Sequence, residues 1–333
     1  RALFTGGISG ATSIAQQLTL VVGMAGGAVA AREGRLLALA GAALFPEGPV
    51  RRWARLLSSG AAAAVTFVLF WGAAQFVRSG IGTGKVLVYG IPLWVVQLAL
   101  PAGFLLVAAR LVWTSAERWR GRLAAAALCA ALLAACLWLP VDPAALRWPA
   151  LALLLVAAAA GAPVFALLGG AALILFWGAG VPVAAVSVEH YRLVTNPSLP
   201  AIPLFTLAGY YLAEGGASAR LIRVFNALLG AVRGGPAIVT VLVCAFFTTF
   251  TGASGVTVLA LGGLLMPVLL AAKYSERDSL GLLTGAGSLG LLFPPCLPLI
   301  LYAIVAKVSV ESVFLGGIAP GVVMLALAAG WGV

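Results

Sequence analysis

Three hydroxyl side chains lie close together in the middle of a long apolar segment. The stretch TGASGVT holds, in order, Thr251, Gly252, Ser254, Gly255 and Thr257. Unwound backbone at membrane depth persists only where protein buries it or where it lines a watery cavity. There, free carbonyl and hydroxyl oxygens can bind a cation, and helix N-termini can face an anion. The stretch therefore predicts a site for a cation and an anionic substrate, with the hydroxyls of Thr251, Ser254 and Thr257 close to it.

Close packing of helices is the alternative explanation, because small residues let membrane helices approach one another. We prefer that explanation for Gly169–Gly170 and Gly262–Gly263, which stand in apolar runs without hydroxyls. It accounts for the glycines of TGASGVT but not for its cluster of hydroxyls.

A second interrupted segment has the sequence GAGSLGLLFPPCLP and contains Gly287, Ser288, Pro294 and Pro295. Proline cannot donate a backbone hydrogen bond, and Pro295 disfavours helical geometry at the residue before it. Apolar segments flank this break as well. We expect these four residues to belong to the same cation and substrate site.

A third interruption is LPAIPLF, where Pro200 and Pro203 break a short apolar piece that ends at a glycine pair. This pattern suits a re-entrant hairpin better than a full span. Three interrupted apolar segments in one module indicate a secondary transporter. A channel, a scaffold and a membrane enzyme remain alternatives at this point.

The composition identifies the class of protein that holds these breaks. The chain has 333 residues, of which 63% are hydrophobic and only 9% are charged, whereas a soluble domain carries about 25% charged residues. It is therefore an all-α polytopic membrane protein. One histidine, nine acidic residues and four scattered cysteines are too few for a metal or acid–base enzyme site, so we expect no enzyme and no cofactor.

The net charge of +11 comes from arginines at the ends of apolar segments. The positive-inside rule and anionic lipid explain them, so the partner is the lipid bilayer and we expect no nucleic-acid partner. Lys and Arg number five in residues 32–55, two in 78–85, four in 110–122 and one in 140–148. The loops that are rich in Lys and Arg are expected to be cytoplasmic.

Gly and Pro become more frequent within the apolar segments of the second part of the chain. We therefore divide it into a module at 1–121, a linking transmembrane helix at 122–140 and a transport module at 141–333. Residues 215–235 contain apolar residues at helical spacing with arginines beside them, which predicts a helix along the cytoplasmic surface. An ordinary connecting helix is the alternative. The expected spans or broken halves are 12–31, 57–77, 90–113, 123–139, 148–160, 163–180, 237–267, 279–293, 295–307 and 313–333.

Three long motifs resemble the large membrane subunit of TRAP (tripartite ATP-independent periplasmic) transporters. They are IPLFTLAGYYLAEGG, RGGPAIVTVLVCAFFTTFTGASGVTVLALGGLLMP and GSLGLLFPPCLPLILYAIVAKVSVESVFLGGIAPG, and the likeness runs from about residue 151 to the end. Residues 1–120 resemble the small subunit, so the chain is similar to the fused form. The resemblance implies a small four-helix-type module fused to the first half of an elevator-type transporter, in a bacterial inner membrane.

The family resemblance also implies a mechanism. A periplasmic binding protein delivers an organic anion, such as a dicarboxylate, keto acid or sugar acid, and the membrane unit imports it with sodium. A membrane scaffold or receptor that only docks the binding protein is the alternative. The resemblance implies that a hydroxyl-rich motif helps to bind sodium and to line the substrate site. That motif falls on residues 251–254, so Thr251 and Ser254 are the implied sodium ligands, with Ala253 where a hydroxyl is usual. Cys296 stands where the Pro-Pro motif usually continues with Ser.

Sulfur is a poor ligand for a hard cation, so we assign Cys296 no ligand role. We expect the chain to be truncated at both ends, with the remaining ligands in a second, inverted half.

Overall fold

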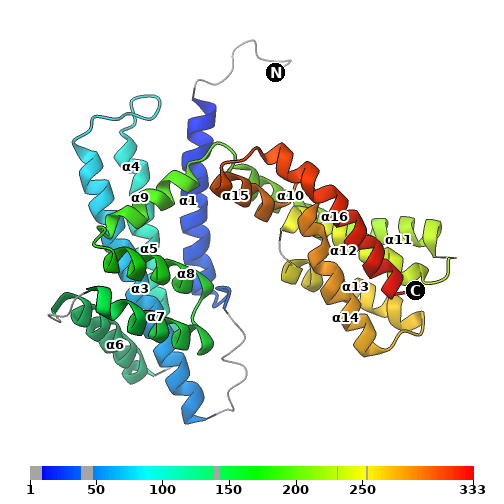
Figure 1. The fold of residues 1–333 in the computed structure, drawn as a ribbon, viewed down its shortest axis with the longest axis horizontal. Helices are drawn as coiled ribbons and strands as arrows, with labels where there is room; N and C mark the ends of the chain where they lie inside the picture. The colour runs from blue at the N-terminus through cyan, green and yellow to red at the C-terminus, as the bar shows by residue number, and fades with distance from the viewer. Residues whose placement is uncertain (1–9, 39–47, 117, 139–142, 231, 253) are drawn as a thin grey trace. The chain divides into compact units, whose positions relative to one another are not determined.

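The computed structural model describes residues 10–38, 48–116, 118–138, 143–230, 232–252 and 254–333 (Figure 1). Within these residues every extended regular element is a helix. The contacts divide the chain into two compact units, Arg1–Thr195 and Asn196–Val333. The predicted departure at Ala253 and residues 139–140 of the predicted linking helix lie outside the described residues.

Among the described residues, the first unit contains eight helices. They are α1 (Ala11–Arg32), α3 (Pro49–Ile81), α4 (Leu93–Gln97), α5 (Ala99–Thr114), α6 (Trp119–Trp138), α7 (Pro143–Ala159), α8 (Val164–Gly178) and α9 (Ala184–Val194). The helix predicted to link the modules corresponds to α6.

Helix α3 is the centre of this unit, because α5, α6, α8 and α9 all pack against it. Its small residues permit this. A Cβ on Gly60 would lie 2.7 Å from Leu128 of α6, and a Cβ on Gly72 would lie 3.1 Å from the carbonyl oxygen of Val183, just before α9. Small residues at such crossings let helix backbones approach closely, as membrane helices require.

Helix α9 is held against the other helices of the first unit by a partly buried hydrogen bond and two aromatic contacts. Gln17 of α1 donates a hydrogen bond from Nε2 to the Tyr191 hydroxyl at 2.8 Å. The Tyr191 ring lies 5.2 Å from that of Phe76, and the His190 ring meets Phe104 edge-on at 5.6 Å. A segment far along the chain thereby joins the N-terminal helices.

The second unit contains the remaining helices. They are α10 (Ala201–Glu214), α11 (Ala217–Leu229), α12 (Gly235–Thr251), α13 (Ser254–Ala271), α14 (Glu276–Leu289), the 3₁₀ turn η1 (Gly290–Leu292), α15 (Leu297–Ala306) and α16 (Val310–Trp331).

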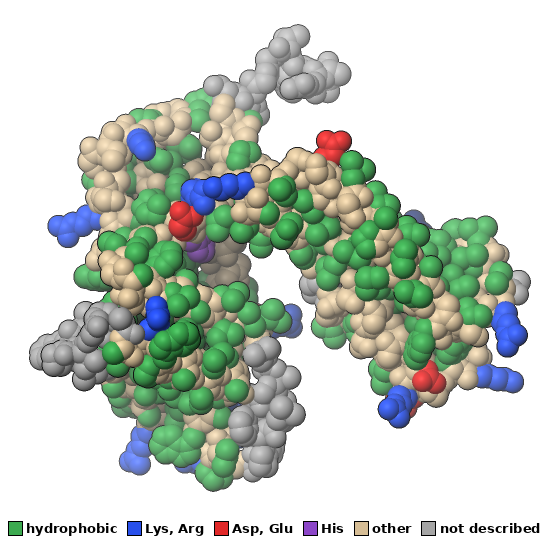
Figure 2. All heavy atoms as spheres, viewed as in Figure 1, with side chains coloured by type: hydrophobic (Ala, Val, Ile, Leu, Met, Phe, Trp, Pro, Cys, Tyr) green, Lys and Arg blue, Asp and Glu red, His purple; other side chains and the backbone are tan. Residues whose placement is uncertain are grey.

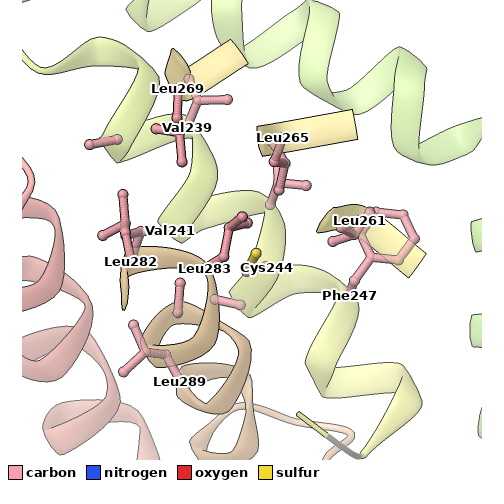
Figure 3. Close-up of a cluster of buried hydrophobic side chains, with 14 of the residues drawn as sticks. Val239, Val241, Cys244, Phe247, Leu261, Leu265, Leu269, Leu282, Leu283 and Leu289 are labelled. Carbon is pink, nitrogen blue, oxygen red and sulfur yellow. The ribbon is translucent and has the colours of Figure 1, made fainter. Parts of the chain in front are cut away.

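Helix α12 forms the core of the second unit. Its valines and Phe247 are fully buried against α13 and α14 (Figure 3). Helix α13 contributes Leu261, Leu265 and Leu269, which recur every four residues and so share one face. This packing fixes α12, and therefore its C-terminal end, relative to α14.

The helices and the surface both have the character of a membrane protein. By length and composition, four described helices can cross a bilayer: Ala11–Arg32, Pro49–Ile81, Leu93–Thr114 and Val310–Trp331. A bent pair, Glu276–Leu292 with Leu297–Ala306, would make a fifth. Hydrophobic side chains cover most of the visible surface (Figure 2). The predicted all-α polytopic class is confirmed.

Candidate functional site: two helix breaks that meet

The first predicted break separates α12 from α13 at Gly252. Gly252 adopts a left-handed conformation with φ of 64°, and its N–H donates to the carbonyl oxygen of Thr248 at 2.8 Å. This conformation costs a residue with a Cβ about 1–2 kcal/mol, which explains why glycine stands here. The chain therefore leaves one helix and enters the next within a few residues.

Three threonine hydroxyls gather around this break. The Thr257 hydroxyl lies 2.9 Å from that of Thr248 and 2.9 Å from that of Thr251. Thr248 and Thr257 are completely buried, and Thr251 is half-buried. We call Thr248, Thr251, Thr257 and the carbonyl oxygen of Gly287 the oxygen cluster.

Helix α14 supplies the fourth oxygen. The Thr248 hydroxyl lies 2.9 Å from the Gly287 carbonyl oxygen, and 2.8 Å from the carbonyl oxygen of Cys244 in its own helix. A hydroxyl has a single proton, so Thr248 cannot satisfy both carbonyls fully. Several acceptor oxygens therefore surround the single proton of Thr248.

The absence of a side chain at Gly287 brings α13 and α14 together. A Cβ there would lie 2.9 Å from Val258 Cγ2 and 3.3 Å from the carbonyl oxygen of Ser254. Ser254 is the first residue of α13, so the start of α13 is held beside the part of α14 that carries the Gly287 carbonyl.

The second predicted break lies against the first. The 3₁₀ turn η1 ends α14, and a cis peptide joins Pro294 to Pro295 before α15 begins at Leu297. A Cβ on Gly252 would lie 2.9 Å from three side-chain atoms of Leu297. Two breaks that are far apart in sequence therefore meet at one place.

Not every predicted residue joins the oxygen cluster. Ser288 is exposed, and its hydroxyl donates to the Gly285 carbonyl of its own helix at 2.8 Å. Gly255 and Pro294 are also exposed. Thr251, Gly252, Ser254, Thr257, Gly287 and Pro295 lie at or beside the meeting of the breaks.

Thr248 was missed by the sequence reasoning, although it makes the contacts that join α12, α13 and α14. A signal was present: Thr248 and Thr251 are three residues apart, so they share a face of the helix immediately before the break.

Pro200 and Pro203, predicted to interrupt a short apolar piece, stand at the start of a helix. Helix α10 begins at Ala201, so Pro200 precedes it and Pro203 lies in its first turn. The first-turn N–H groups have no partner within the helix, so proline is tolerated there. The 14 residues of α10 extend about 21 Å, less than the roughly 30 Å of a bilayer core. The re-entrant hairpin stays a prediction.

The chemistry of the oxygen cluster is that of neutral, hard ligands. From Gly235 to Ser275 the sequence contains no Asp, Glu or His. Glu276 and Asp278 stand at the other end of α14, about 14–16 Å along the helix from Gly287 at 1.5 Å per residue. Within the described residues no group of three His, Cys, Asp or Glu side chains could hold a metal ion. Hydroxyl and carbonyl oxygens without carboxylates suit a monovalent cation better than a divalent one.

The broken helices and the oxygen cluster between them define a multi-pass membrane protein of the secondary-transporter type. Comparison with known families agrees with this class. Residues 151–330 match the family model described as "Tripartite ATP-independent periplasmic transporter, DctM component", and residues 1–121 match the DctQ component. The chain belongs to the TRAP transporter permease family, with both components in one polypeptide, as the resemblance implied.

Individual relatives carry several substrate names. The chain is 34% identical over 238 residues to the isethionate TRAP transporter permease protein DctMQ of Oleidesulfovibrio alaskensis, which covers 69% of this chain and 37% of the relative. It is 35% identical over 163 residues to the C4-dicarboxylate TRAP transporter large permease protein DctM of Vibrio cholerae. That alignment covers 48% of this chain and 36% of the relative. It is 37% identical over 130 residues to the ectoine/5-hydroxyectoine TRAP transporter large permease protein UehC of Ruegeria pomeroyi. That alignment covers 39% of this chain and 30% of the relative.

The chain spans about a third of the length of these relatives.

Proposed function

We propose that this chain is part of a permease that imports an organic anion across a bacterial inner membrane, driven by a sodium gradient. A periplasmic binding protein delivers the substrate, and an elevator-type movement carries it inward. Two of the relatives are named for isethionate and for C4-dicarboxylates, both of which are organic anions. Family membership supports transport, and the oxygen cluster is the observation that carries the sodium part of the proposal.

Sodium fits the oxygen cluster for two reasons. Three hydroxyls and one carbonyl oxygen are linked by successive contacts of 2.9 Å in a largely buried place. All four are hard, neutral ligands. Coupling to protons at this break would most readily use an Asp, Glu or His side chain, and the stretch that forms the first break and its flanking helices contains none of these.

The breaks also supply what an anion requires. Helix α13 starts at Ser254 and helix α15 starts at Leu297, beside the first break. The N-terminus of a helix carries a partial positive charge and unsatisfied N–H groups. We propose that substrate carboxylate or sulfonate groups bind near these two N-termini, next to the sodium ion.

The test is uptake of labelled organic anions into proteoliposomes that contain the intact transporter, with its binding protein outside. Uptake that requires an inward sodium gradient and saturates with loaded binding protein is the expected result. Uptake that ignores the sodium gradient would refute the coupling. Docking of the binding protein without any uptake would favour the alternative, a membrane scaffold or receptor.

A further inference from the structure

Helix α11 presents two different faces. Its inner face holds Ile222, which is buried, and Phe225 and Leu229, which pack against the core of the second unit. That face fixes the helix to α12, the helix that ends at the oxygen cluster.

The outer face of α11 combines exposed apolar and cationic side chains. Val224 and Leu228 are 54% and 70% exposed. Arg220 is exposed and lies four residues before Val224, so these three residues form one row along the helix. Arg223 is exposed beside that row.

The row continues beyond the helix. Val232 and Arg233 are both exposed in the short connection to α12. The sequence from 217 to 233 contains three arginines and no acidic residue. Among the residues that the structure describes, none of the three arginines forms an ion pair; the ion pairs are Arg32–Glu33 and Glu189–Arg192.

Only one kind of environment satisfies both types of side chain. Exposed leucine and valine are unfavourable in water, and arginine is unfavourable in hydrocarbon. At the boundary of a bilayer the apolar stems and neighbours enter the acyl region while the guanidinium groups reach the phosphates. The side chains of an acidic protein would pair with the arginines, but they would not bury the exposed Val224 and Leu228.

The position of α11 in the chain favours the same occupant. Gly216 and Gly234, both with φ of 73°, bound the segment and turn the chain at each end. They connect α11 to the apolar helices α10 and α12, which are expected to enter the membrane from the same surface.

We propose that the outer face of α11 is a binding surface for anionic phospholipid headgroups, with Arg220, Arg223 and Arg233 as the phosphate-binding residues. This inference rests on the membrane placement of the chain and does not require that it couples transport to sodium. Each arginine near a negatively charged leaflet strengthens binding roughly fivefold, so the three together contribute on the order of 100-fold.

The test uses the intact transporter in detergent, titrated with phosphatidylglycerol or phosphatidylcholine, and measures lipid binding by native mass spectrometry. The double variant Arg220→Gln/Arg223→Gln should bind phosphatidylglycerol roughly 25-fold more weakly, and phosphatidylcholine unchanged. The Lys replacements at both positions should restore most of the binding, because the charge is kept.

The matched control removes two cations elsewhere. Lys273 and Arg277 lie in the turn before α14 and its first residues, next to Glu276 and Asp278, so that stretch has no net charge. The variant Lys273→Gln/Arg277→Gln should bind phosphatidylglycerol like the parent protein. Equal binding by the α11 variant and the parent would overturn the proposal.

A second measurement locates the surface. A fluorophore on Leu228→Cys, with the native cysteines replaced, should be quenched by lipids that carry a nitroxide near the headgroup. It should be protected from an aqueous quencher. Lack of lipid quenching would mean that water or another protein covers this face, and either result would overturn the proposal.

Discussion

Replacing Thr248 by valine tests the oxygen cluster most sharply, because valine keeps the shape of threonine and removes only the hydroxyl. That hydroxyl contacts Thr257 at 2.9 Å and the Gly287 carbonyl oxygen at 2.9 Å, so it joins three helices. Interhelical hydrogen bonds in membrane proteins are worth about 0.6 kcal/mol each. Two of them predict a loss of roughly 1 kcal/mol of stability, which leaves the protein folded.

The effect on sodium should be larger than the effect on stability. A hydrogen-bonding group that serves a charged partner contributes about 1.5–3 kcal/mol. If the Thr248 hydroxyl faces the ion, its loss raises the half-saturating sodium concentration of uptake by roughly 10- to 100-fold. Thr248→Ser keeps the hydroxyl and loses one methyl group, so its sodium dependence should stay close to that of the parent protein.

Helix α12 offers a matched control in Thr240. Thr240 is completely buried, as Thr248 is, but its hydroxyl donates only to the Pro236 carbonyl of its own helix at 2.8 Å. Thr240→Val makes the same chemical change in the same helix without touching the cluster. Sodium titrations of uptake in proteoliposomes should therefore separate the two variants. The same half-saturating sodium concentration in both would refute the reasoning.

Three further predictions concern other parts of the structure. Gly252→Ala should lower the unfolding temperature and abolish uptake, since its φ of 64° and the contact with α15 both oppose a Cβ, whereas Gly255→Ala, with nothing within 4 Å, should change little in both assays. Tyr191→Phe should destabilise the first unit by about 1–2 kcal/mol in denaturant titrations, because the buried Gln17 loses its acceptor; an unchanged midpoint would contradict this. Burial lowers the pKa of His190 below 6.5, so the unfolded state binds a proton first and stability should fall as the pH drops from about 7.5 to about 5.5. His190→Phe should flatten that dependence in thermal scans, and an equal slope in both proteins would show that another group is responsible.

The helices were predictable from the sequence because apolar runs of membrane length have few other solutions. The break at Gly252 was predictable as well, since glycines and hydroxyls interrupt such a run. The role of Pro203 was not, because the same proline can end one helix or stand in the first turn of the next. Only the neighbouring dihedral angles distinguish the two.

The membership of the oxygen cluster was predicted in part, whereas its role as a sodium and substrate site stays a prediction. Thr251 and Thr257 join the cluster as expected. Thr248 was missed because its partner, the Gly287 carbonyl, is 39 residues away and is reached only through the crossing of two helices. Ser288 was included for its hydroxyl, but adjacent positions on a helix point about 100° apart. The carbonyl of Gly287 faces the cluster while the Ser288 side chain bonds its own turn.

The sequence also did not predict which helices α9 packs against. Residues 151–330 match the large component, yet α9 packs on α1 and α3 of the small one. Periodicity indicates which face of a helix is apolar, but it does not identify the helix that covers that face.

Direct binding of sodium to the purified intact transporter tests the central claim most directly. Thr257 contacts both other hydroxyls of the cluster, so radioactive sodium binding should be compared between the parent protein and Thr257→Val, with Thr240→Val as the control. The account predicts saturable binding by the parent and the control, and binding at least tenfold weaker in Thr257→Val, corresponding to about 1.4 kcal/mol. Sodium binding by Thr257→Val with the affinity of the parent protein would contradict it.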